Sequence, residues 1–215
     1  MPIVLCVSSL KGGVGKSTIA ANLATALHRG GHRTLVVDAD PQGTLRSWAA
    51  VAAEAEHDGP PVIALDGAAL RRDLPRVAEG FAVVVIDAPP RLGAEARAAM
   101  LAADLVIMPS TPGAGDVWAL RQTLSVFADA QGLRPELKGV AVLNRAGRTT
   151  LARMTAKALE SSGVPLLDET LGDRVAFGEA TLAGQGVVDY APGSPAAREV
   201  KKLTKAVLAA VGDNR

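Results

Sequence analysis

Short runs of consecutive apolar residues alternate along the chain with stretches in which apolar residues recur at helical spacing. Polar residues do not interrupt the apolar runs, which is typical of strands buried on both faces of a sheet. Strands are expected at 3–7, 33–38, 62–65, 81–87, 105–108 and 139–144. Helices are expected at 19–27, 43–56, 68–78, 94–102, 116–130, 149–161 and 195–211, with Pro75 breaking or kinking the third of them. This alternation predicts an α/β fold, a mostly parallel, twisted sheet with helices on both faces.

The composition is typical of one globular unit with an aliphatic core. Of the 215 residues, 48% are hydrophobic and 21% are charged, but only 3% are aromatic. We expect residues 1–215 to form a single domain. The lone cysteine, Cys6, allows no intrachain disulfide, which fits a reducing, cytoplasmic compartment. No apolar run approaches the roughly 20 residues that a membrane-spanning helix needs.

A glycine-rich segment lies between the first expected strand and the first expected helix. It comprises Lys11, Gly12, Gly13, Val14, Gly15, Lys16, Ser17 and Thr18. Strand, glycine-rich loop and helix form the context of a phosphate-binding loop, in which backbone N–H groups surround a polyphosphate. Lys16 can reach the β- and γ-phosphates of a nucleotide, and the Ser17 hydroxyl can bind Mg²⁺. The full motif G-x-x-x-x-G-K-[ST] is not met, because Leu10 occupies the position of its first glycine.

Three aspartates follow two of the expected strands. Asp38 and Asp40 lie in the segment V-V-D-A-D-P-Q, and Asp87 ends the run V-V-V-I-D. Ligands bind at the carboxyl ends of strands in open parallel sheets, so these carboxylates are expected beside the phosphate-binding loop, where they can hold Mg²⁺. An aspartate after a strand is also a common helix cap or turn residue. Two such strands downstream of the loop favour the metal site over the capping role.

These segments resemble the motifs of the ParA/MinD family of ATPases. K-G-G-V-G-K-S resembles the deviant Walker A box of that family, D-A-D-P-Q its A′ box, and Asp87 its Walker B aspartate. The resemblance spans nearly the whole chain and is closest to the small ParA-type partition ATPases. It implies a P-loop NTPase fold of the deviant Walker A type, which binds ATP and Mg²⁺ and slowly hydrolyses ATP to ADP and phosphate.

The resemblance also implies a role for each matching residue. Lys11 would cross a dimer interface to contact the partner's nucleotide, so ATP binding and homodimerisation would be linked. Asp40 would orient the attacking water, Asp38 would support the metal shell, and Asp87 would contact Mg²⁺ through water. The predicted catalytic residues are therefore Lys11, Lys16 and Asp40, and the predicted metal ligands are Ser17, Asp38 and Asp87.

Two further positions resemble the base-binding elements of the family. Asn144 ends a strand where relatives hydrogen-bond the adenine base, and Pro192 lies in a loop expected to cover the same base. An asparagine after a strand is also a common turn former, so both interpretations of Asn144 stay open.

The last expected helix separates apolar from basic residues. Val200, Leu203 and Val207 fall on one side of it. The opposite side carries Arg198, Lys201, Lys202 and Lys205. This basic side is either the solvated face of a core-packing helix or a stripe that contacts DNA phosphates without sequence preference. Three more basic residues are expected to extend such a stripe: Arg148, Arg153 and Lys157.

Together these features predict an ATPase whose ATP-dependent homodimerisation gates nonspecific binding to double-stranded DNA. It would associate with the nucleoid, respond to a partner adaptor protein that stimulates hydrolysis, and position a plasmid, a chromosome region or a protein cargo. A MinD-like membrane-cycling ATPase is one alternative, disfavoured because the last helix contains no Trp or Phe as an interfacial anchor. A metabolic ATP-dependent ligase or synthetase on the same fold is another, disfavoured because it needs no lysine acting in trans.

Overall fold

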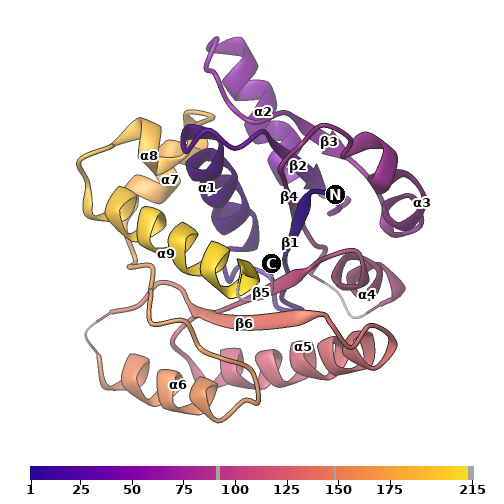
Figure 1. The fold of residues 1–215 in the computed structure, drawn as a ribbon. Coiled ribbons are helices and arrows are strands. Elements are labelled where there is room, and N and C mark those ends of the chain that lie inside the picture. The colour runs from indigo at the N-terminus through magenta and orange to yellow at the C-terminus, as the bar shows by residue number, and fades with distance from the viewer. Residues whose placement is uncertain (91–92, 148, 213–215) are drawn as a thin grey trace.

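The structure is a computed structural model that describes residues 1–90, 93–147 and 149–212. Its strands are β1 (Ile3–Val7), β2 (Thr34–Asp38), β3 (Val62–Ala64), β4 (Val83–Asp87), β5 (Leu105–Ser110) and β6 (Lys138–Leu143). They form a six-stranded sheet in the order β3-β2-β4-β1-β5-β6, and every pairing is parallel (Figure 1). The expected α/β fold with a parallel sheet is confirmed.

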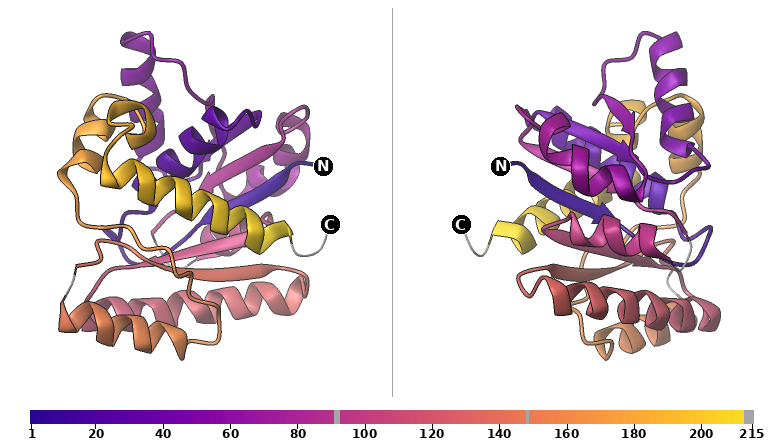
Figure 2. Two further views of the ribbon diagram at one scale, coloured as in Figure 1. Left: turned by 60° about the vertical axis from the view of Figure 1, so that its left-hand side comes forward. Right: turned by 90° about the vertical axis from the view of Figure 1, so that its right-hand side faces the viewer.

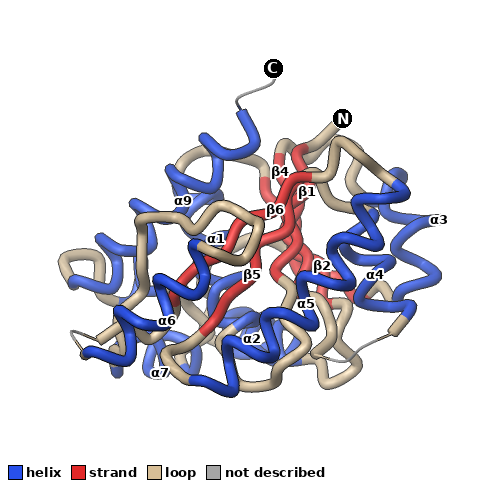
Figure 3. The backbone as a smooth tube through the Cα atoms, turned by 90° about the horizontal axis from the view of Figure 1, so that it is seen from below, coloured by secondary structure: helices blue, strands red, loops and turns tan. Residues whose placement is uncertain are grey.

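Helices cover both faces of this sheet. They are α1 (Lys16–Arg29), α2 (Thr44–Glu54), α3 (Gly67–Val77), α4 (Ala94–Leu101), α5 (Ala114–Leu133), α6 (Thr150–Glu160), α7 (Val175–Leu182), α8 (Val187–Tyr190) and α9 (Pro195–Gly212). One layer contains α1, α2, α7, α8 and α9, and the other contains α3, α4, α5 and α6 (Figure 2). Successive side chains of a strand point to opposite faces of the sheet. Leu5 of β1 therefore packs in the core under α1 and α9, and Cys6 packs in the core under α4 and α5. Figure 3 shows the strands enclosed between these helices.

The strand register brings three chemically important segments to one edge of the sheet. Val7, the last residue of β1, is paired with Asp87 of β4, and Asp87 is also paired with Asp38 of β2. Strands β1, β2 and β4 therefore end at the same level. The glycine-rich loop that follows β1 consequently starts beside both aspartates.

Helix α3 contains Pro75, where a break or a kink was expected. The helix is not broken there and continues to Val77. Pro75 lies in its last turn and lacks the N–H that would bond the carbonyl of Arg71, so the helix loses one backbone hydrogen bond there. At the other end, Asp66 caps the helix by accepting a hydrogen bond from the amide of Ala69 at 2.9 Å.

Helices α7 and α8 were not expected from the sequence. The α7 segment V-A-F-G-E-A-T-L is apolar on nearly every side, so it has no periodic pattern of the kind that marks an amphipathic helix. Its residues Val175 and Leu182 are exposed. A long-range bond fixes the start of α8, because Asn22 of α1 accepts a hydrogen bond from the amide of Val187 at 2.8 Å. Within 1–90, 93–147 and 149–212, no helix combines the length and apolar character needed to cross a membrane.

Candidate functional site

The glycine-rich loop leads directly into the N-terminus of α1. Gly13 and Gly15 have φ angles of 78° and 91°, a left-handed backbone that L side chains rarely adopt. A Cβ atom at Gly15 would lie 2.3 Å from the Asn144 side-chain nitrogen, so the space also requires glycine there. No side chain caps α1 and its first turn has no acidic residue, which leaves its first amides free to bind an anion.

Lys16 is the first residue of α1 and places its ammonium group inside the site. It is only 7% exposed. Burial lowers its pKa, and the charges of Asp87 and Asp40 oppose this shift. A buried cation beside two carboxylates is suited to polyphosphate, because it can pair with phosphate oxygens without first being stripped of water.

Asp87 is a buried carboxylate without a hydrogen-bond partner. The residue is completely buried, and neither side-chain oxygen is hydrogen-bonded to any described group. Burial raises its pKa to about 7, while the nearby Ser17 hydroxyl and the charge of Lys16 oppose the shift. Buried polar oxygens are normally paired, and a divalent cation would supply the missing partner. The hard oxygen donors of Asp87 and Ser17 fit Mg²⁺.

Asp38 is a buried carboxylate that accepts hydrogen bonds from the backbone. Its Oδ1 accepts from the amide of Asp40 at 3.2 Å, and its Oδ2 accepts from the amides of Leu45 and Arg46 at 3.1 and 3.0 Å. These bonds cap the N-terminus of α2 and fix the turn that carries Asp40. The capping role, which the sequence left as the less favoured alternative, is the one its contacts support. Its support of a metal shell stays a prediction.

Asp40 lies at the end of that turn with part of its carboxylate free. Its Oδ1 accepts from the amide of Gln42 at 3.0 Å, and the residue is 9% exposed. Its Oδ2 has no hydrogen bond to another described residue, so this oxygen is available to a water molecule. Gly43, with a φ of 68°, lets the chain leave the turn into α2.

Lys11 is held within its own chain by α5. Its Nζ donates to Asp116 Oδ1 at 2.8 Å, and the Thr111 hydroxyl donates to the same oxygen at 2.7 Å. The Lys11 side chain is 40% exposed and that of Asp116 is 10% exposed. In this state the ammonium of Lys11 is paired with a carboxylate of its own chain.

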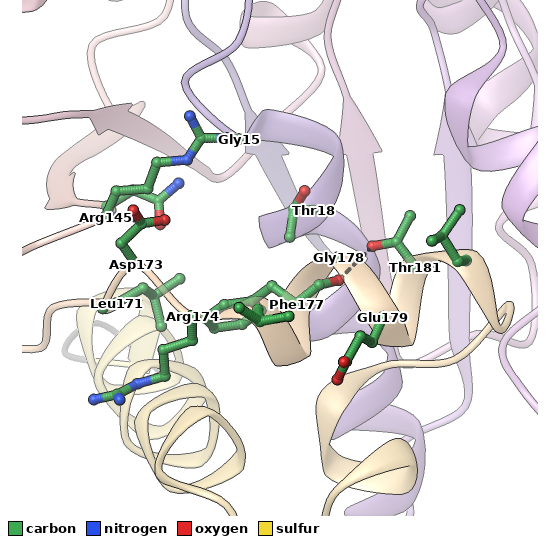
Figure 4. A pocket seen from close by; sticks show the side chains of 14 residues that line it. Gly15, Thr18, Arg145, Leu171, Asp173, Arg174, Phe177, Gly178, Glu179 and Thr181 are labelled. Atoms are coloured by element: carbon green, nitrogen blue, oxygen red, sulfur yellow. Dashed lines mark hydrogen bonds between the residues drawn. The ribbon is translucent and has the colours of Figure 1, made fainter.

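A cavity of about 710 Å³ opens beside the glycine-rich loop (Figure 4). Gly15 and Thr18 form one wall, Asn144 and Arg145 another, and the segment 171–182, including α7, forms the rest. The cavity continues from the glycine-rich loop, so it would accommodate the base and sugar of a nucleotide whose phosphates lie at that loop.

Of the two residues predicted to contact the base, one lines the cavity and the other does not. Asn144 lines the cavity, but its Nδ2 donates to the Val14 carbonyl at 2.8 Å and its Oδ1 accepts from the Arg145 amide at 2.9 Å. Its amide group thus holds the glycine-rich loop in shape. Pro192 is exposed and does not line the cavity.

Sequence reasoning missed Arg145 and the segment 171–182. Arg145 has a φ of 50°, which is unusual for a residue with a side chain. No pattern in the sequence indicates that this residue lines the cavity.

A family model decides what kind of protein carries this site. The model of the CobQ/CobB/MinD/ParA nucleotide-binding domain matches residues 5–187. The chain belongs to this family. The match includes the glycine-rich loop, all three aspartates and the wall of the cavity, so the expected ParA/MinD relationship is confirmed.

Individual members of the CobQ/CobB/MinD/ParA family are similar over nearly the whole chain. The chain is 32% identical to the maintenance of carboxysome distribution protein A of Halothiobacillus neapolitanus, over 95% of both chains. It is also 32% identical to the chromosome-partitioning ATPase Soj of Thermus thermophilus, over 96% of both. Among solved structures, MinD of Pyrococcus horikoshii with Mg-ADP is 23% identical with a TM-score of 0.78, over 99% of this chain and 98% of that one. Cobyrinic acid a,c-diamide synthase of Mycobacterium smegmatis, with an ATP analogue and magnesium, is 25% identical with a TM-score of 0.81, over 100% of this chain and 97% of that one.

The basic residues predicted to meet DNA fall into two groups on this family fold. Those of α9 are all exposed: Arg198, Lys201, Lys202 and Lys205. Arg153 and Lys157 are exposed on α6, which belongs to the other helical layer. Arg148 lies outside the described residues. The structure therefore gathers the α9 residues into one stripe and does not join them to α6 on one face of the sheet.

Proposed function

We propose that this protein is a ParA-type ATPase, residues 1–215 acting as one unit, that binds ATP with Mg²⁺, dimerises around it and positions a cargo along the nucleoid. The observation that carries the proposal is the meeting of Lys16, Asp40 and Asp87 at the phosphate-binding loop, where the charges of both carboxylates act on the Lys16 ammonium. The names of the similar proteins, a carboxysome distribution protein and a chromosome-partitioning ATPase, support a positioning role in the cytoplasm.

The residues of the site suit phosphoryl transfer to water, which needs charge neutralisation and a positioned nucleophile rather than covalent catalysis. The loop amides and Lys16 would hold the β- and γ-phosphates, and the cavity beside Thr18 would hold the base and sugar. Ser17 and Asp87 would hold Mg²⁺, which neutralises charge on the phosphate oxygens when it is bound. Asp40 would orient the attacking water with its free Oδ2, while Asp38 keeps the Asp40 turn in place.

Dimerisation would require Lys11 to exchange one partner for another. In a single chain its ammonium pairs with Asp116. In the dimer it would instead contact the γ-phosphate held by the second copy. Assembly would therefore cost two such ion pairs and gain two contacts to phosphate, so it would depend on a bound triphosphate.

Weakening the hold on Lys11 should favour assembly. Asp116→Asn removes the negative charge but keeps an acceptor for the Thr111 hydroxyl. A partly exposed ion pair is worth at most about 1 kcal/mol, so releasing two of them should tighten the ATP-bound dimer by up to roughly 30-fold. Sedimentation equilibrium with a slowly hydrolysed ATP analogue measures this. Lys11→Ala is the opposing control and should weaken the dimer; an equally strong dimer in Lys11→Ala would argue against action in trans.

The stripe on α9 would bind DNA through its phosphate backbone. Lys201, Lys202 and Lys205 are exposed, and none of them pairs with an acidic residue in the described part of the chain. A dimer presents the stripe twice, so avidity would make DNA affinity follow the nucleotide state.

Reversing the charge of this stripe should abolish DNA retention. In Lys201→Glu/Lys202→Glu/Lys205→Glu, attraction to phosphates is replaced by repulsion, and binding to a random-sequence duplex should fall at least about 100-fold at moderate salt. ATP binding should stay within about twofold of wild type, because these side chains lie outside the nucleotide cavity. The matched control is Arg153→Glu/Lys157→Glu on α6, measured in the same gel-shift assay. A larger loss in this control would move the DNA surface to α6.

A gel shift on random-sequence duplex, with ATP, with ADP and without nucleotide, tests the proposed function as a whole. We expect retention with ATP only, decreasing steeply as salt is raised. A parallel sedimentation with anionic lipid vesicles separates this function from that of a membrane-cycling relative. ATP-dependent pelleting with vesicles, together with no DNA retention, would replace the proposal by the MinD-like alternative.

A further inference from the structure

One ion pair joins the wall of the nucleotide cavity to the helix that carries the basic stripe. Glu199 of α9 accepts hydrogen bonds from the Arg174 guanidinium, with Nε 3.1 and 3.0 Å from its two oxygens, and Nη2 closes the fork. The same carboxylate accepts from the Gly172 amide at 3.0 Å. Gly172 and Arg174 both line the cavity. Figure 4 shows Arg174 pointing away from Thr18, on the side of α9.

This contact is stronger than an ordinary surface pair. The side chains of Glu199 and Arg174 are 23% and 37% exposed, and the forked geometry uses two N–H groups of a rigid guanidinium. Burial alone would raise the pKa of Glu199, but the bonds from Arg174 and Gly172 outweigh it and hold the pKa below its ordinary value. Glu199 is therefore charged and engaged at neutral pH.

Residues 171–174, which Glu199 contacts at Gly172 and Arg174, are also hydrogen-bonded to the sheet and the loop after it. The amide of Leu171 donates to the Leu143 carbonyl of β6 at 3.1 Å, and the amide of Ala146 donates to the Leu171 carbonyl at 2.8 Å. Residues 171–174 thus span the distance from β6 to α9 as a short, tethered wall. Arg174 is also the N-cap residue that directly precedes α7, so the wall and α7 are anchored together.

Glu199 is the only acidic residue in the sequence of α9. Its side chain faces the cavity wall, whereas Arg198, Lys201 and Lys202 are exposed. The charge of Glu199 is neutralised by Arg174, so the outer face of the helix stays purely cationic. Glu199 is thus the side chain through which the cavity wall and the helix are hydrogen-bonded.

We propose that Glu199 is a positioning residue that couples nucleotide occupancy of the cavity to the placement of α9 and its basic stripe. The coupling to DNA rests on the proposed function, but the coupling to α9 does not. Contact with a bound nucleotide fixes the position of residues 171–174, the fork to Glu199 passes this constraint to α9, and the stripe takes up a defined position. Without the fork, the cavity and the stripe respond to their ligands independently.

Hydrogen exchange of the α9 amides with and without saturating ADP tests the coupling. ADP lacks the γ-phosphate that Lys11 would contact, so dimerisation does not contribute to the signal. In wild type, ADP should slow exchange in 195–212 at least about fivefold, and in Glu199→Gln this effect should disappear although nucleotide is saturating. The matched control is Glu136→Gln, which removes a Glu–Arg pair that is not in the nucleotide cavity and should behave as wild type. Unchanged α9 protection in Glu199→Gln, or none in wild type, would overturn the inference.

DNA affinity measured at saturating ATP and at saturating ADP adds the functional readout. The ratio of the two affinities should fall at least tenfold in Glu199→Gln and remain unchanged in Glu136→Gln. A wild-type ratio of one would contradict the proposed function and leave the exchange experiment to decide on the coupling. If Glu199→Gln does not fold, Arg174→Gln breaks the same fork from the loop side and leaves α9 intact. If Glu199→Gln lowers the thermal stability but leaves α9 hydrogen exchange and the ratio of DNA affinities as in wild type, Glu199 has a purely structural role and the inference is wrong.

Discussion

Lys16→Ala is expected to abolish ATP binding. The ammonium of Lys16 is buried at the start of α1, where it would form charge-assisted hydrogen bonds to the phosphates. Losing two such bonds costs about 3 kcal/mol or more, which corresponds to at least about a 100-fold rise in Kd. The remaining carboxylates of Asp40 and Asp87 would then repel the triphosphate. Titration with a fluorescent ATP analogue in the presence of Mg²⁺ measures the change.

Lys157→Ala is the matched control for this loss, because it removes an exposed lysine of α6 that lies outside the cavity. Its ATP affinity should equal that of wild type. Thermal melts without nucleotide should show that Lys16→Ala is folded. Micromolar ATP affinity in folded Lys16→Ala would contradict the role assigned to the loop.

Asp40→Ala is expected to stop hydrolysis and trap the ATP-bound dimer. Removing the carboxylate leaves no group to orient the attacking water, whereas the phosphate-binding amides, Lys16 and Lys11 remain. We expect hydrolysis to fall at least about 100-fold while ATP binding is retained. Size-exclusion chromatography with ATP should show a stable dimer, and with ADP a monomer. A monomer in the presence of ATP would count against the water-orienting role.

Two companion variants separate chemistry from structure at this turn. Asp40→Asn keeps the acceptor for the Gln42 amide and should trap the dimer as Asp40→Ala does, if the charge is what matters. Asp38→Ala should act on folding instead, because it leaves three backbone amides without their acceptor. Each unpaired buried donor costs about 1–3 kcal/mol, so Asp38→Ala should melt many degrees below wild type.

The sequence was most informative where one physical requirement acts on consecutive residues. The inner strands β2, β4 and β5 are buried along their whole length, so each contains an unbroken apolar run, and the order of strands and helices predicted the parallel sheet. The glycine-rich loop was equally clear, because a loop that wraps a phosphate needs left-handed backbone at Gly13 and Gly15 and a lysine at the helix start. Both predictions depend on residues that are neighbours in the chain.

The sequence was least informative where partners lie far apart. Lys11 and Asp116 are 105 positions apart, and Arg174 meets Glu199 across 25, so no local pattern indicates either pair. Asp38 and Asp40 look alike as acids after a strand, but only the fold shows that one caps α2 and the other is partly free. Helix α7 was not predicted because a segment that is apolar on nearly all sides shows no helical periodicity of apolar and polar residues.

The burial of Cys6 in β1 has a practical consequence for spectroscopy. Its thiol is fully buried, and burial raises its pKa, so almost none of it is thiolate at neutral pH. Maleimide dyes and spin labels react with exposed thiolates, so they should not react with Cys6 in the folded protein. A second cysteine placed on the exposed surface of α5 or α9 can therefore be labelled selectively in the otherwise native chain, and distances between two copies can be followed through a turnover cycle.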